Sequence, residues 1–321
     1  MSSSMSGPTT LDLVVRDKQL VADGVMLVTL VHPEGSAVPY WQPGAHIDLH
    51  LGTGRVRQYS LCGDPSDRSS WQIAVLRDDH GRGGSVTVHS DAFCVGLPVT
   101  TGGPRNNFAL VDAERFAFIV GGIGITPILP MIDALERDGK SWTLMYGGQH
   151  RGSMAFLDRL SYYGERVQVF PQDEFGLLDV LGFVNRCSDG TQIYCCGPAP
   201  LIDATRESVE SISTQVDLHV ERFTAVALDD SNDKEFSVNL SRSGITVTVR
   251  PDQSILDACE LAGISTLSSC AEGICGTCET SVLAGTPEHR DEVLTDAEQE
   301  SGDTMMICVS RAKTPSITLD L

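Results

Sequence analysis

The sequence predicts a multidomain protein with three blocks of different fold class along its 321 residues. Short runs of alternating apolar residues, up to about Asn106, predict an all-β block. From Phe116, continuous apolar runs alternate with helical ones, which predicts an α/β block with a parallel sheet. From Phe236, two strands, a helix and a loop of closely spaced cysteines predict a small α+β module. A chain of this length has room for two or three domains of ordinary size.

The N-terminal block is predicted to be a small β-barrel. Its runs VMLVTLVHP, HIDLHL, WQIAVL and SVTVHS alternate as half-buried strands do, and glycine and proline separate them. The segment MSSSMSGPTT ahead of them lacks the basic and apolar parts of a signal peptide, and we interpret it as a short disordered lead.

The central block is predicted to be a parallel sheet covered by helices. FAFIVGGIGITPILPMIDALER indicates a buried strand, a glycine-rich turn and a helix, and WTLMYGG, VQVFPQD and QIYCCGPAP supply further apolar strands. The turn GGIGITP and the segment CGP both follow strands, so we expect both at the carboxyl edge of the sheet, where such folds bind ligands. The residues concerned are Gly121, Gly122, Gly124, Thr126 and Pro127 in the turn, and Cys196, Gly197 and Pro198 in the segment.

Two interpretations of these residues stay open. The turn is not a complete dinucleotide fingerprint, because Thr126 and Pro127 follow Gly124, so a purely structural tight turn is nearly as well supported by the turn alone. Cys196 can lie beside a ligand bound at this edge or be a buried structural thiol.

The C-terminal module begins near Phe236, after the polar segment LDDSNDKE, which we interpret as a linker. FSVNL and ITVTV predict two strands, and a helix that Asp252 or Ser254 can cap follows them. Cys259 lies on this helix and is interpreted as a buried structural thiol.

Four cysteines of this module have the spacing of a plant-type [2Fe–2S] cluster. Four residues separate Cys270 from Cys275, two separate Cys275 from Cys278, and Cys308 follows thirty positions later. Three thiolates from one loop and a fourth from elsewhere complete the coordination of two irons. Small residues are expected to let backbone N–H groups approach the sulfurs: Ala271, Gly273 and Gly276. A structural zinc site is the alternative, but zinc prefers paired Cys-x2–4-Cys knuckles on both sides.

Charge and composition narrow the class of protein. The chain carries 43 acidic and 23 basic side chains, a formal charge of −20. This balance disfavours nucleic acid and anionic membranes as partners and suits a protein that docks on a basic surface. No apolar run approaches the roughly 20 residues that span a bilayer, so we expect a cytoplasmic protein. Ten cysteines in such a chain indicate metal or redox chemistry rather than disulfides.

Two motifs of the barrel block are compatible with a flavin or phosphate site. In RQYSL, Arg57 can donate to phosphate or flavin oxygens, Tyr59 can lie against a flat ring, and Ser60 can meet ring heteroatoms. In HGRGGSVTVH, backbone N–H groups ahead of Ser85 can cradle a phosphate, at Gly81, Gly83 and Gly84. The alternatives are an ordinary strand with a surface arginine and a flexible hairpin loop.

The order of these motifs along the chain resembles that of a known protein superfamily. RQYSL, GGS, PRNNF, GGIGITP, CGP and ERF (Glu221 to Phe223), followed by the cysteine loop, resemble the ferredoxin–NADP reductase superfamily and in particular the phthalate dioxygenase reductase family. Vanillate demethylase reductases belong to the same group. The resemblance implies a ferredoxin reductase-like FMN-binding barrel over residues 1–108, an NAD(P)H-binding domain over 109–228 and a β-grasp [2Fe–2S] ferredoxin domain over 229–321.

The resemblance also implies roles for single residues. The strand Ala74, Val75 and Leu76 would border the flavin, Thr126 would lie near its ring, and Phe223 would stack on it where the nicotinamide enters. Cys196 would lie near the nicotinamide, with a buried structural thiol as the alternative. FMN itself would contact Arg57, Tyr59, Ser60, Gly83, Gly84 and Ser85. Family members often carry an arginine where this chain has Gln149, with Arg151 two positions later. A 2′-phosphate requires clustered basic side chains, so this departure favours NADH over NADPH.

The implied activity is electron transfer. Hydride carries two electrons and a [2Fe–2S] cluster accepts one, so a flavin between them must divide the pair. The resemblance implies a reductase of aromatic-compound catabolism that passes electrons from NADH through FMN and the cluster to a partner oxygenase. That oxygenase is of the Rieske type in most relatives and a cytochrome P450 in some. A redox sensor or a structural iron–sulfur module is the alternative, and the flavin and nicotinamide motifs favour the reductase. No general acid or base is needed for the hydride step.

Overall fold

The computed structural model describes residues 10–52, 56–80, 83–223 and 233–321, and the chain divides into two compact units, Met1–Phe223 and Thr224–Leu321. Three predicted features fall wholly or partly outside the described residues. They are the disordered lead, Gly81 of the GRGGS loop and most of the linker LDDSNDKE. Thr10, the last residue of the predicted lead, is instead the first residue of a strand.

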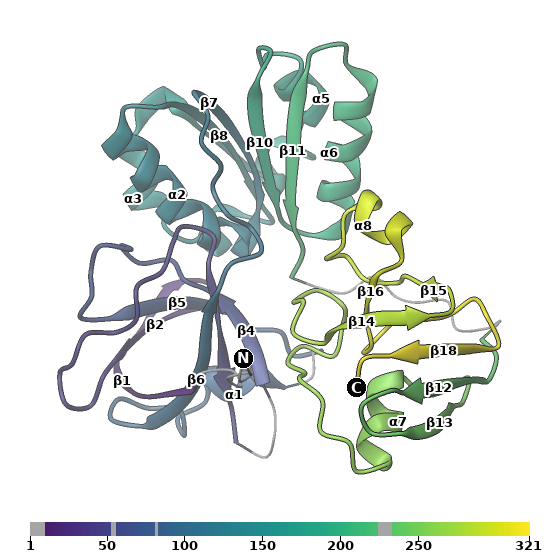
Figure 1. The fold of residues 1–321 in the computed structure, drawn as a ribbon. Helices are drawn as coiled ribbons and strands as arrows, with labels where there is room; N and C mark the ends of the chain where they lie inside the picture. Colours follow the sequence, from purple (N-terminus) through teal and green to yellow (C-terminus); the bar gives the residue numbers. More distant parts are fainter. Residues whose placement is uncertain (1–9, 53–55, 81–82, 224–232) are drawn as a thin grey trace. The chain divides into compact units, whose positions relative to one another are not determined.

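The first unit contains a six-stranded antiparallel sheet in the order β4-β3-β6-β1-β2-β5 (Figure 1). A bridge between Leu61 and Ile73 joins its two edges, so the sheet closes into the predicted barrel. Fully buried side chains such as Leu30, Ile47 and Trp71 fill the interior. The strands are β1 (Thr10–Ala22), β2 (Val25–Val31), β3 (His46–His50), β4 (Val56–Ser60), β5 (Trp71–Leu76) and β6 (Pro98–Arg105).

The prediction that SVTVHS forms a strand was wrong, because the segment is a short helix, α1 (Gly84–His89). Gly83 has a left-handed conformation with φ 78°, which turns the chain into the helix, and Thr87 N donates to Gly83 O at 3.1 Å. Val88 is fully buried in the barrel core. Burial of this one side chain outweighs the weak strand preference of alternating β-branched residues.

The same unit contains a five-stranded, wholly parallel sheet in the order β11-β10-β7-β8-β9 (Figure 1). The predicted strands of the central block are confirmed as β7 to β10, and β11 was not predicted. The strands are β7 (Arg115–Gly121), β8 (Ser141–Gly148), β9 (Val167–Pro171), β10 (Thr191–Cys196) and β11 (Val216–Glu221).

Helices cover both faces of this sheet, because alternate residues of its strands are apolar on both faces, as β10 illustrates. Tyr194 and Cys196 belong to the core cluster that packs under α2, whereas Ile193 and Cys195 belong to a second cluster that packs under α5 and α6. The α-helices are α2 (Ile125–Asp138), α3 (Leu157–Ser161), α4 (Gln172–Phe175), α5 (Val180–Val184) and α6 (Ala199–Ser211). Three 3₁₀ turns accompany them, η1 (Gly122–Gly124), η2 (Arg151–Ser153) and η3 (Gly164–Arg166).

Barrel and parallel sheet share one core cluster. It contains Val25 and Ala74 of the barrel together with Val120 of the parallel sheet, and Phe108 lies at the junction. Gly44, with φ 91°, permits this approach, since a Cβ there would lie 2.0 Å from the carbonyl oxygen of Phe108. Residues on both sides of the predicted boundary between residues 108 and 109 therefore pack in the same core cluster.

The second unit contains a mixed sheet in the order β13-β12-β18-β14-β16, in which β12 and β18 are parallel. Ser254 caps its helix α7 (Ile255–Leu261) in a reciprocal pair with Asp257, and Cys259 is fully buried in the core beneath. The remaining elements are β12 (Phe236–Leu240), β13 (Ile245–Val249), β14 (Glu279–Ala284), β15 (Pro287–Glu288), α8 (Asp296–Ser301), β16 (Thr304–Met306), β17 (Arg311–Ala312) and β18 (Ser316–Leu319).

None of the helices in the described ranges combines the length and the apolar composition that crossing a bilayer requires.

Candidate functional site

The four predicted cysteine ligands come together in the second unit. Cys278 Sγ lies 3.1 Å from Cys308 Sγ, and the thiol of Cys270 interacts with those of Cys275 and Cys308. None of the four is more than 7% exposed. Cys308 follows β16, and Ile307 N donates to Cys278 O, which brings the distant thiol to the loop. Within the described parts of the chain, no three His, Cys, Asp or Glu side chains surround one point suited to a single ion. The four thiols form one connected group, in which Cys308 contacts both Cys270 and Cys278. A [2Fe–2S] cluster requires four thiolates for two irons.

Backbone N–H groups of the cysteine loop donate to the sulfurs. Glu272 N donates to Cys270 Sγ at 3.3 Å, and Thr277 N donates to Cys275 Sγ at 3.5 Å. Such donors stabilise the thiolate charge and tune the potential of a bound cluster. The loop needs three left-handed conformations, which the predicted small residues supply: Ala271 (φ 54°), Gly273 (φ 71°) and Gly276 (φ 74°).

The two predicted flavin motifs meet at the start of α1. A Cβ on Gly84 would lie 2.5 Å from Cγ of Arg57, so the arginine side chain lies directly across this glycine. Ser85 Oγ accepts a hydrogen bond from Asp78 N at 3.0 Å, so this hydroxyl holds the loop that leads into the helix. The arginine, Gly83, Gly84 and Ser85 thus form one group, with a guanidinium beside the backbone of a turn.

Strand β4 presents its predicted flavin residues on two faces. Arg57 and Tyr59 share one face and Ser60 points to the other, because side chains alternate along a strand. Burial raises the pKa of Tyr59 to about 12, against the opposing charge of Arg57, so the phenol keeps its proton. Ser60 is buried.

Strand β5 is tied to α1. A ring nitrogen of His89, the last residue of α1, bonds to the carbonyl oxygen of Val75 at 2.9 Å. Ala74 and Val75 are buried, and Leu76 is exposed. The strand predicted to border the flavin therefore lies against the helix that carries the predicted phosphate loop.

The turn GGIGITP and the segment CGP pack backbone against backbone at the carboxyl ends of β7 and β10. A Cβ on Gly124 would lie 2.2 Å from Cys196 O, and one on Gly121 would lie 2.6 Å from Cδ of Pro198. A Cβ on Gly197 would lie 2.9 Å from Gly121 N. Glycine is thus required at positions 121, 124 and 197, because the two segments approach so closely that a Cβ would clash.

The rest of the turn starts helix α2. Gly122 has φ 55° and open space around it, so its conformation rather than its neighbours favours glycine there. Thr126 is buried and donates from Oγ1 to Ile123 O at 3.0 Å, and Pro127 is buried in the first turn of the helix. Their side chains pack inward. Gly121, Gly122 and Ile123 are half-buried, and Gly124 is buried.

One candidate residue was missed by the sequence predictions. Glu221 ends β11 opposite Cys196 in register, and its Oε2 lies 3.9 Å from the thiol. Burial raises the pKa of Glu221 to about 8, so its carboxyl group is largely protonated at neutral pH. Burial raises the pKa of Cys196 well above its usual value, so it is a neutral thiol rather than a nucleophile. The sequence signal that could have found Glu221 is its position: it is the last residue of the run VDLHVE and the first residue of the ERF motif. Phe223 packs against the core cluster that contains Cys196.

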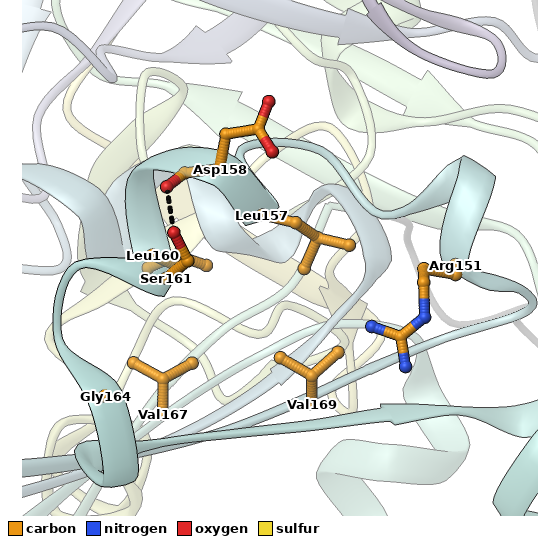
Figure 2. A pocket seen from close by; sticks show the side chains of 8 residues that line it. All are labelled: Arg151, Leu157, Asp158, Leu160, Ser161, Gly164, Val167 and Val169. Atoms are coloured by element: carbon orange, nitrogen blue, oxygen red, sulfur yellow. Dashed lines mark hydrogen bonds between the residues drawn. The ribbon is translucent and has the colours of Figure 1, made fainter.

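A pocket of about 440 Å³ lies beside the edge strand β9 (Figure 2). Its described lining is mostly apolar, with one basic side chain, that of Arg151. The loops at this edge are tied together, because Asp173 N donates to Gln149 O at 3.1 Å. The lining residues are Arg151, Leu157, Asp158, Leu160, Ser161, Gly164, Val167 and Val169.

Known proteins resemble this chain over almost its whole length. A family described as the 2Fe-2S iron-sulfur cluster binding domain matches residues 238–313. The chain is 42% identical to the phenoxybenzoate dioxygenase subunit beta of Ectopseudomonas oleovorans, over 94% of each chain. The structure of phthalate dioxygenase reductase matches with a TM-score of 0.73 and 34% identity, over 97% of this chain and 98% of that one. An intact type IV self-sufficient cytochrome P450 monooxygenase matches with a TM-score of 0.88 and 44% identity; 97% of this chain covers 41% of that one.

Proposed function

Because the chain belongs to the phthalate dioxygenase reductase family, we propose that it is the reductase component of an oxygenase system. It takes hydride from NADH onto FMN and passes single electrons through a [2Fe–2S] cluster to a partner oxygenase. The observation that carries this proposal is the convergence of Cys308 on the distant loop of Cys270, Cys275 and Cys278 in the matched iron–sulfur domain. The proposal assigns FMN to residues 1–108, NADH to 109–228 and the cluster to 229–321.

The side chains have separate tasks in this proposal. FMN, when bound, accepts the hydride pair and releases it as single electrons. The Arg57 guanidinium and the N–H groups at Gly83 and Gly84 hold its phosphate. Gly121 to Gly124 present backbone N–H groups to the pyrophosphate of NADH. The protonated Glu221 carboxyl and the neutral Cys196 thiol offer hydrogen bonds, without charge, beside the place proposed for the nicotinamide.

The partner that we propose is a Rieske-type aromatic oxygenase or demethylase. Relatives named as phthalate 4,5-dioxygenase reductase and vanillate O-demethylase oxidoreductase support it. A cytochrome P450 is the second candidate, supported by the structural match to a self-sufficient P450. A redox sensor would show little turnover, so steady NADH-dependent reduction of ferricyanide and cytochrome c by the purified chain supports a reductase. Turnover with one purified oxygenase of each type then separates the two partner classes.

Arg57→Ala is expected to weaken FMN binding by about 1.5–3 kcal/mol, because it removes a charge-assisted contact to phosphate. Dissociation constants of FMN, measured by fluorescence on flavin-depleted protein, test this. Arg137→Ala, which removes an exposed arginine of α2, is the matched control and should bind FMN normally. Unchanged FMN affinity in Arg57→Ala, or stoichiometric FAD in the flavin released by heat, contradicts the assignment.

Salt is expected to slow electron delivery to the oxygenase and to leave NADH–ferricyanide turnover nearly unchanged. Residues 236–321 carry thirteen acidic and five basic side chains, a net charge of −8. We propose that the exposed acids steer this unit onto a basic acceptor, an attraction that salt screens. Five of the acids lie in the segment HRDEVLTDAEQES, residues 289–301, which we call the acidic run. Asp291 of this run is buried and accepts from Val293 N, Leu294 N and Ser310 Oγ. The exposed acids of the run are Glu292, Asp296, Glu298 and Glu300.

Steady-state rates at increasing NaCl concentration, with oxygenase and with ferricyanide as acceptors, measure this effect. The variant Asp296→Asn with Glu300→Gln should lower the oxygenase rate at low salt and reduce its salt dependence. Glu207→Gln with Glu210→Gln on α6 changes the net charge equally and is the control. Equal salt dependence for both acceptors removes the support for steering.

A further inference from the structure

A two-point ion pair joins the loops that follow two neighbouring parallel strands. Arg151 begins η2 after β8, and Glu174 lies in α4 after β9. Arg151 Nη2 lies 3.3 Å from Glu174 Oε2, and Arg151 Nε lies 3.4 Å from Glu174 Oε1. The side chains are 55% and 44% exposed, so the pair adds little to stability and both groups remain accessible to a ligand.

The order of the strands places this pair on the adenosine side of the proposed NADH site, so the inference rests on the proposed function. The turn at Gly121 to Gly124 ends β7, the central strand, and Cys196 and Glu221 end β10 and β11 on one side of it. A dinucleotide with its pyrophosphate on the central turn and its nicotinamide toward Cys196 extends its adenosine over the other side. That side consists of β8 and β9, and the pair lies at their carboxyl ends.

The pocket beside this pair has the size and lining of a small-molecule subsite. Figure 2 shows Arg151 at one end of the pocket and Gly164 and Val167 at the other. Its volume of about 440 Å³ and its mostly apolar lining suit a purine ring. Among the lining residues that the structure describes, Arg151 alone is basic and Asp158 alone is acidic. A phosphate at this end of the dinucleotide would thus depend on Arg151.

Glu174 changes what Arg151 can bind. The carboxylate occupies Nε and Nη2, and with them one of the two guanidinium edges through which an arginine can hold a phosphate in a two-point contact; it shares Nη2 with the other edge. A 2′-phosphate would also meet the negative charge of Glu174 at close range, where like charges repel. A ribose with free 2′- and 3′-hydroxyls can instead donate to that carboxylate, the arrangement by which an acidic residue selects NAD.

We propose that Glu174, held in place by Arg151, is the residue by which this chain selects NADH over NADPH. The carboxylate of Glu174 accepts hydrogen bonds from the adenosine ribose hydroxyls. Its ion pair with the Arg151 guanidinium competes with the binding of a 2′-phosphate. Arg151 thereby positions the selecting carboxylate instead of binding phosphate itself.

Glu174→Gln is the decisive variant, because it removes the charge and keeps the size of the side chain. The measured quantity is kcat/KM for NADH and for NADPH with ferricyanide as acceptor. We expect the NADPH-to-NADH ratio of kcat/KM to rise at least about tenfold, mainly through a lower KM for NADPH. In Glu174→Gln with Arg151→Ala the rise should disappear, since no guanidinium is left for the phosphate. Glu210→Gln on α6 makes the same charge change away from β8 and β9 and should keep the original ratio.

The outcomes separate this inference from the proposed function. If the unchanged chain reduces ferricyanide with NADH and Glu174→Gln leaves the nucleotide ratio unaltered, the selectivity proposal is overturned and the reductase function stands. A ratio that stays raised in the double variant overturns the role of Arg151. If neither nucleotide reduces the flavin of the unchanged chain, the proposed function itself fails.

Discussion

Cys308→Ser is expected to lower electron delivery to the oxygenase by more than about 100-fold. The reason is the geometry of the thiols, in which Cys308 supplies the partner of Cys278 at 3.1 Å. Without it, one iron lacks a thiolate, so the cluster should be lost or labile. NADH–ferricyanide turnover should persist, because ferricyanide takes electrons directly from the flavin and the proposed flavin residues belong to the other compact unit.

The measurements are the visible absorption of the cluster, the iron content and the two turnover rates. Cys259→Ala is the matched control, since it removes another buried thiol of the same unit that lies in the core beneath α7. Its cluster and oxygenase turnover should remain. Retention of a stable cluster in Cys308→Ser, or loss of hydride transfer with FMN still bound, would show that the assignment of ligands or of domains is wrong.

Gly124→Ala is expected to destabilise the first unit by about 3 kcal/mol, because the new Cβ would lie 2.2 Å from the backbone oxygen of Cys196. Neither backbone can move without separating the turn after β7 from the end of β10. The melting temperature should fall by roughly 5–10 °C. NADH-dependent flavin reduction should slow by about 100-fold even below that temperature, since a displacement of about 1 Å misaligns the reacting groups.

Gly122→Ala is the control for the effect on stability. It lies in the same turn with φ 55° and open space, so alanine there costs only the left-handed strain of about 1–2 kcal/mol. Thermal unfolding measures both variants, and stopped-flow reduction of the flavin by NADH measures Gly124→Ala. A Gly124→Ala protein with unchanged stability would mean that the two turns do not pack as closely as the structure shows.

Much of this architecture followed from local patterns. The apolar runs FAFIVGG and WTLMYGG predicted buried parallel strands, because both faces of such strands are covered and their side chains need not alternate in polarity. Ser254 was one of two predicted caps, and its hydroxyl needs only the backbone three residues away. The cysteine spacing indicated the cluster because most of its ligands come from one short loop.

Tertiary packing decided the remaining features, each of which depends on a partner far away in sequence. Val88 is buried in the barrel core, which makes SVTVHS a helix where alternation predicted a strand. Glu221 owes its raised pKa to burial beside Cys196, and Asp291 is buried against Ser310 despite its place in an acidic run. The pairing of Arg151 with Glu174 likewise depends on β8 and β9 being neighbours.

The sequence alone thus determined the class of each block, the four candidate cysteine ligands and the order of the motifs, because periodicity and spacing act over a few residues. The tertiary structure alone decided which side chains face one another: Arg57 across Gly84, Cys196 beside Glu221, and Arg151 with Glu174. The physical reason is that burial, charge pairing and backbone contact depend on distances in space, and only the packed chain brings distant residues within such reach.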